Sequence, residues 1–93
     1  MKSEFQNVPA GRPVSIDQLK FYLEQGREIE FVYAGKEYFI AHTEKGRNIW
    51  SGEQKISADF KADQLEEFIY VTIQDKSLID IFSSNEGLIQ TIF

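Results

Sequence analysis

The residue types best suited to chemistry are a histidine and a glutamate two positions apart, His42 and Glu44. On a strand, both side chains would point to the same face. The pair could bind one metal ion, or work as an acid and a base near neutral pH. A metal site needs a third ligand, and none is visible nearby. We therefore expect His42 to be a partly buried residue at the edge of a sheet, with no metal and no cofactor.

Other catalytic groups are scarce. The chain has no cysteine, which excludes disulfides and thiolate sites. No serine lies in a nucleophile-elbow pattern, and the glycine turns are isolated rather than gathered in a phosphate-binding loop. Glu28 and Glu30 could act as paired carboxylates, but exposed glutamates on a strand usually keep a surface soluble. The sequence predicts a protein that is not an enzyme; an enzyme centred on His42, with Glu44 or Glu28, remains the alternative.

The glutamates and His42 lie on or next to a predicted hairpin over residues 29–40, which must position their side chains. A two-residue turn at Ala34-Gly35 places Phe31 opposite Tyr38 and Ile29 opposite Ile40. One face, the core face, then collects Ile29, Phe31, Tyr33, Tyr38 and Ile40. The other, the mixed face, collects Glu28, Glu30, Val32, Glu37, Phe39 and Ala41. A register shifted by one residue would bury glutamates among aromatic rings, which is costly.

A second turn at Lys45-Gly46 leads into a third strand that carries Trp50, the only tryptophan. This turn pairs His42 with Ile49 and Ala41 with Trp50, so Trp50 joins the mixed face. Apolar residues ringed by carboxylates are typical of interaction surfaces. Two interpretations stay open: a C-terminal helix covers the mixed face, or a partner protein binds it. The residues of the predicted partner site are Val32, Phe39, Trp50, Glu28, Glu30 and Glu37.

The clearest helix spans residues 15–25. Ser15 and Gln18 have capping-box spacing, and Gly26 suits a left-handed cap at the other end. Its apolar stripe of Ile16, Leu19 and Leu23 is expected to pack on the core face.

The patterns that indicate helices and strands are weaker after residue 52. Residues 54–60 could form a fourth, edge strand, and residues 62–69 and 77–82 suit short helices. Residues 88–93 suit a helical turn about as well as a short strand. We expect the apolar Ile92 and Phe93 to dock on the body of the protein, against Phe21.

Length and composition indicate a single folded domain. The 93 residues are 42% apolar and 14% aromatic, enough for one modest core. We predict a single α+β domain over residues 14–93, after a flexible N-terminal arm over residues 1–13. Its fold is an antiparallel meander of three to four strands, with the N-terminal helix packed on one face and short C-terminal helices.

Charge and hydropathy limit the partners. The formal net charge of −5 argues against nucleic acid as a partner. No apolar run approaches the roughly 20 residues of a membrane span, so we expect no membrane partner and a cytoplasmic location.

Four segments, residues 26–31, 35–40, 60–68 and 75–78, follow one another in a distinctive order. In this order of parts the chain resembles small, mostly uncharacterised proteins of Gram-positive bacteria and their phages. The resemblance implies the same fold and an origin in a bacterium, a phage or another mobile element.

We therefore expect a small non-enzymatic interaction module, a regulator or inhibitor of a host protein. An acidic mimic of nucleic acid is a further alternative. The chain is expected to be a monomer, or a homodimer joined through an edge strand at residues 48–51 or 54–60.

Overall fold

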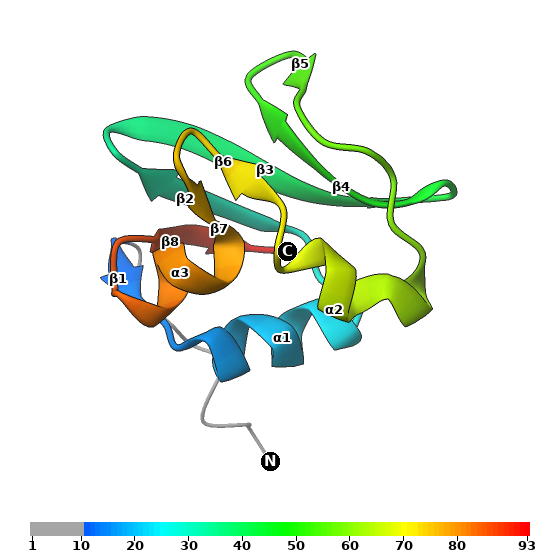
Figure 1. Cartoon of the computed structure of the whole chain (residues 1–93), viewed down its shortest axis with the longest axis horizontal. Coiled ribbons are helices and arrows are strands. Elements are labelled where there is room, and N and C mark those ends of the chain that lie inside the picture. The colour runs from blue at the N-terminus through cyan, green and yellow to red at the C-terminus, as the bar shows by residue number, and fades with distance from the viewer. Residues whose placement is uncertain (1–10) are drawn as a thin grey trace.

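The computed structural model describes residues 11–93 and shows an α+β fold (Figure 1). Six antiparallel strands form one sheet, in the order β1-β8-β2-β3-β4-β5. Those strands are β1 (Arg12–Pro13), β2 (Ile29–Tyr33), β3 (Lys36–Thr43), β4 (Gly46–Ser51), β5 (Gln54–Lys55) and β8 (Leu88–Ile92). A separate two-stranded hairpin joins β6 (Thr72–Ile73) to β7 (Lys76–Ser77). The helices are α1 (Ile16–Glu24), η1 (Ala62–Gln64), α2 (Leu65–Phe68) and α3 (Leu78–Ser83).

The β2–β3 hairpin has the predicted register. Phe31 lies opposite Tyr38, and Ile29 lies opposite Ile40. The turn residues Ala34 and Gly35 both have positive φ angles, 52° and 77°, as a type I′ turn requires. The β2–β3 pairing was therefore predicted correctly by choosing the register that separates carboxylates from aromatic rings.

The β3–β4 turn lies one residue earlier than predicted. Residues 44 and 45 form the turn, so His42 pairs with Arg47 and Phe39 pairs with Trp50. The predicted partners, Ile49 for His42 and Trp50 for Ala41, are wrong by two residues. Because a shift of two preserves the alternation of side chains, Trp50 still lies on the mixed face.

Gly46 begins β4 instead of closing the turn, because another backbone lies against it. A Cβ atom at this position would come within 2.3 Å of the Phe60 carbonyl oxygen. Phe60 in turn exchanges two backbone hydrogen bonds with Arg47, of 2.7 and 2.8 Å. Only a glycine fits this close approach.

The sheet has more strands than the predicted three or four, because the C-terminal segment enters it. β8 pairs with β2 on one side and with β1 on the other. The structure thus assigns residues 88–92 to a strand. Arg12 and Pro13, expected in the flexible arm, form β1, and Gly11 before them donates to the Ile89 carbonyl; residues 1–10 of that arm lie outside the described residues.

α1 has the predicted start and end. Ser15 and Gln18 form both bonds of the capping box, of 3.0 and 3.1 Å. Gly26, with φ 76°, caps the other end: its own backbone N–H donates to the Leu23 carbonyl, and the N–H of Arg27 donates to the Tyr22 carbonyl. Leu19, Tyr22 and Leu23 are buried in the core, against the core face of the sheet.

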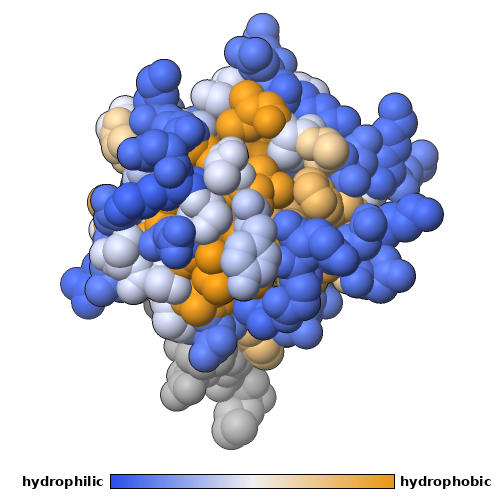
Figure 2. All heavy atoms as spheres, viewed as in Figure 1, coloured by the Kyte–Doolittle hydropathy of each residue, from blue (hydrophilic) through white to orange (hydrophobic). Residues whose placement is uncertain are grey.

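All three α-helices lie on the same side of the sheet, below it in Figure 1. α2 and α3 contribute Leu65, Phe68, Leu78, Ile81 and Phe82 to the same core as Phe31 and Ile40. Figure 2, in the same orientation, shows hydrophilic residues around the rim and hydrophobic residues toward the centre of the view. The longest helix, α1, has nine residues, and within residues 11–93 no helix has the length and apolarity that crossing a bilayer requires.

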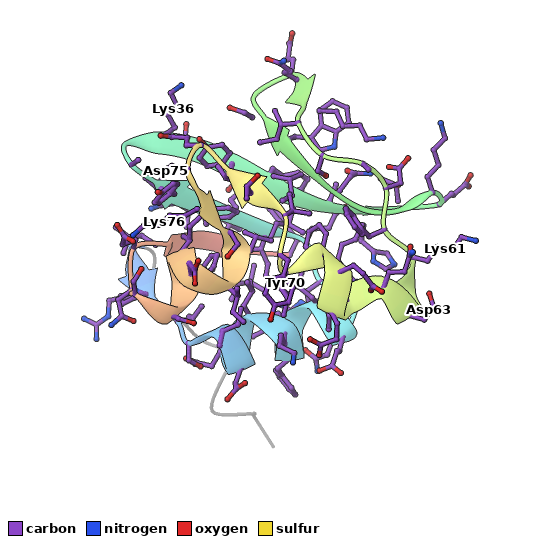
Figure 3. The ribbon with its side chains drawn as sticks, in the orientation of Figure 1. Lys36, Lys61, Asp63, Tyr70, Asp75 and Lys76 are labelled. Carbon is purple, nitrogen blue, oxygen red and sulfur yellow. The ribbon has the colours of Figure 1, made fainter. Side chains whose placement is uncertain are left out.

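The β6–β7 turn ties the helical layer to the sheet. The Tyr33 hydroxyl donates to Asp75 (2.9 Å), and the Gln74 side chain donates to the Tyr38 hydroxyl (2.9 Å). The bond to Asp75 raises the pKa of Tyr33. Both tyrosines lie on the core face, so this hairpin is fixed on the side of the helices, with Asp75 labelled beside it in Figure 3.

Candidate functional site

No helix of the described residues covers the mixed face, although Ala41 and Asn48 on this face are buried. The α-helices and the β6–β7 hairpin pack on the core face, so the interpretation that a C-terminal helix covers the mixed face is wrong for residues 11–93. A solvated sheet face normally carries polar side chains at its outward positions. Here Val32, Phe39, Ala41 and Trp50 occupy such positions, and pairing with Val32 adds Leu88.

Three aromatic side chains form the centre of the mixed face. Phe39 lies directly opposite Trp50 on the neighbouring strand. On its other side, Phe39 contacts Phe93 edge to face, with ring centroids 5.9 Å apart and an interplanar angle of 76°. Phe93 is 57% exposed. The expectation that Phe93 docks against Phe21 is therefore wrong: Phe93 extends the mixed face.

The orientation of Trp50 is fixed by a polar chain. Its indole N–H donates to Asn48 Oδ1 (2.7 Å), and Asn48 Nδ2 donates to Asp59 (2.9 Å). Asp59 also forms an ion pair with Lys55 at 2.7 Å. The bonds from Lys55 and Asn48 lower the pKa of Asp59. Since the only polar atom of the indole is already bonded, the exposed part of the ring is apolar surface held in one position.

The three glutamates of the mixed face differ in their contacts. The Glu28 carboxylate accepts a hydrogen bond from the backbone N–H of His42 (2.9 Å), so it serves the structure. Among the described residues, Glu30 and Glu37 have neither an ion pair nor a side-chain hydrogen bond. Both line a shallow depression of about 590 Å³, together with Phe39, Ala41 and Trp50. The structure thus brings two uncompensated carboxylates and two aromatic rings around one hollow.

Among the described residues, no hydrogen bond or ion pair joins the His42 ring to Glu28 or Glu44, although His42 and Glu44 line one shallow depression. Its side chain is exposed, not partly buried as expected, because it pairs with Arg47 near the end of β3 rather than with Ile49. Glu28 binds the backbone of His42 and not its ring. Within residues 11–93, no three His, Asp or Glu side chains are grouped to hold a metal ion.

Arg47 is a buried cation that the sequence did not indicate. It is 3% exposed; its Nη2 donates to the Leu23 carbonyl at the end of α1 (2.9 Å), and its guanidinium lies 5.9 Å from the centroid of the Phe68 ring. Burial lowers the pKa of Arg47. The negative end of the helix and the ring face stabilise the charge, so Arg47 joins β4 to α1 and α2.

The edge strands proposed for a homodimer are already occupied along most of their length. β4 pairs with β5, and its backbone bonds further to Ile56 and Phe60. Residues 54–60 form a two-residue strand followed by irregular chain, not the predicted continuous strand. Pairing through residues 48–51 would have to displace these contacts.

The sequence missed Phe93, Leu88 and Asn48 as members of the mixed face. The signal that could have placed Phe93 is the alternation of side chains along β8, and the register shift opposite Glu30 and Phe31 disrupts it. Comparisons with models of protein families, with curated proteins and with solved structures find no match for this chain.

Proposed function

We propose that this chain is a protein-interaction module that binds a partner protein through the mixed face. The observation that supports this most is the cluster of Phe39, Trp50 and Phe93 on a sheet face that no described element covers. Aromatic side chains that are rigid and partly exposed are the residues that dominate binding energy at protein interfaces.

The surroundings of the cluster support the same proposal. Phe39 and Trp50 lie near the middle of the sheet, on the central strand β3 and its neighbour β4, and glutamates flank them on β2 and β3. An apolar centre with a polar rim is the usual organisation of a protein interface. Because Trp50 is already held by Asn48, binding would order few new side chains, which lowers its entropic cost.

The experiment is to isolate a partner from the source cell with the wild-type chain and repeat the isolation with a Phe39→Ser/Trp50→Ser variant. Tyr70→Ser is the matched control, because Tyr70 is 62% exposed but lies among the helices (Figure 3). We expect the partner to be retained by the control and lost by the double variant. A partner that both variants retain would exclude the mixed face as the binding site.

A further inference from the structure

The depression on the mixed face combines two features that favour one kind of ligand group. Phe39 and Trp50 provide aromatic surface, and Glu30 and Glu37 provide negative charge. Aromatic faces attract cations, and so do carboxylates. We propose that this depression binds an arginine side chain from an extended segment of the partner; this inference rests on the proposed function.

The register places the charges around the rings. Glu30 lies opposite Phe39, and Glu37 lies opposite Val32. Glu30 and Glu37 are thus diagonal neighbours on adjacent strands, and their Cα atoms are expected to lie roughly 7–8 Å apart. A guanidinium between them could donate to both carboxylates while its plane stacks on an aromatic ring.

No described side chain already supplies this cation. The three ion pairs of the described residues are Lys20–Glu66, Lys55–Asp59 and Lys76–Glu86. Lys55, which lies opposite Trp50 on β5, is held by Asp59 at 2.7 Å. Within residues 11–93 the two carboxylates therefore have no ion-pair partner, and a partner's cation could pair with them.

Charge also distinguishes a second copy of this chain from a positively charged partner protein. A second copy of this chain, docked face to face, would bring Glu30 and Glu37 of both copies together, and like charges at an interface are unfavourable. A cationic segment reverses that interaction. Arginine is preferred to lysine because its guanidinium is planar, more weakly hydrated and able to bond two carboxylates.

The test uses blocked single residues as probes: N-acetyl-arginine amide and N-acetyl-citrulline amide, which is nearly the same shape without the charge. Binding is followed by NMR, through the indole N–H of Trp50 and the backbone amides of β2 and β3. We expect arginine to bind at millimolar concentration, with shifts confined to the mixed face, and citrulline to bind about tenfold more weakly.

Two variants make the test specific. Glu30→Gln/Glu37→Gln should reduce arginine binding to the level of citrulline, whereas Glu67→Gln, an exposed glutamate on α2, should not change it. Val32→Arg, opposite Glu37, should also weaken binding of the probe, because it places a guanidinium inside the site. Equal shifts with both probes, or arginine binding that survives the double variant, would overturn the inference.

The outcome separates this inference from the proposed function. If partner capture depends on Phe39 and Trp50 but arginine does not bind the depression, the cation site is wrong and the interaction face stands. If partner capture does not depend on these rings, both are wrong.

Discussion

The indole N–H of Trp50 donates to the side-chain oxygen of Asn48, two residues earlier on the same strand. Asn48 is 3% exposed and donates onward to Asp59. The position of the Trp50 ring on the mixed face therefore depends on one buried amide. This relationship links the local structure of β4 directly to the proposed binding surface.

Replacement of Asn48 should release Trp50. We expect Asn48→Ala to lower the free energy of unfolding by about 1–3 kcal/mol, because it removes the hydrogen bonds of a buried amide. Since Trp50 is the only tryptophan, fluorescence anisotropy should report faster motion of its ring. Gln54→Ala, at an exposed position on β5, is the control and should change stability by less than about 0.5 kcal/mol. An unchanged anisotropy in the Asn48 variant would show that packing alone holds the ring.

Gly46 should tolerate no side chain. Gly46→Ala should destabilise the fold by more than about 2 kcal/mol, because its φ of 118° is unfavourable for alanine and the new Cβ meets the Phe60 carbonyl. Gly52→Ala is the matched comparison. Gly52 also has a positive φ, 60°, but open space around it, so its cost should stay near 1 kcal/mol. Urea denaturation of both variants measures the difference, and equal costs would mean that the contact with Phe60 is absent in solution.

Asp59 should make stability depend on pH in the acid range. Its pKa is lower in the folded chain than in the unfolded chain, because the Lys55 ammonium and the Asn48 amide stabilise the carboxylate. The unfolded chain then binds more protons near pH 4, so this contribution is present above about pH 4 and is lost as pH falls through the folded pKa.

Asp59→Asn provides the measurement. The difference in unfolding midpoint between wild type and this variant should be constant above about pH 5 and should shrink as the pH approaches 3. The change should be small, because the Lys55–Asp59 pair is partly exposed to solvent. A difference that grows on acidification would contradict the assigned ion pair.

The uncompensated glutamates should keep the chain monomeric. We expect sedimentation at several protein concentrations to give the mass of a single chain, because the face that carries Glu30 and Glu37 repels its own copy. Dimerisation that increases with salt and disappears in Trp50→Ser would instead assign the mixed face to self-association.

The β2–β3 hairpin and α1 could be predicted because their signals are local. One register separates glutamates from aromatic rings, and a capping box with a terminal glycine bounds the helix. For the β3–β4 turn, the sequence predicted Lys45 and Gly46 as the turn residues, because glycine is common in turns. The need for Gly46 comes from the close approach of the Phe60 backbone, which no residue near Gly46 in the sequence indicates. The strand pairing was wrong by two residues, an even number, so the predicted face of Trp50 was still correct.

The C-terminal strand could not be predicted because a bulge disrupts its alternation. Ile89 lies opposite Phe31 and Ile92 lies opposite Ile29, so both accompany core-face residues although they are three positions apart. The register shift between these pairs leaves Gln90 as an extra residue. A spacing of three suits a helix, and this hid both β8 and the place of Phe93 beside Phe39.

The most direct measurement is the affinity of the isolated partner for the wild-type chain, for Phe39→Ser/Trp50→Ser and for Tyr70→Ser, with each fold checked by NMR. We expect wild type and Tyr70→Ser to bind equally, and the double variant to bind at least about 30-fold more weakly, as loss of two central aromatic residues implies. A correctly folded double variant that binds as tightly as wild type would contradict the mixed face as the binding site.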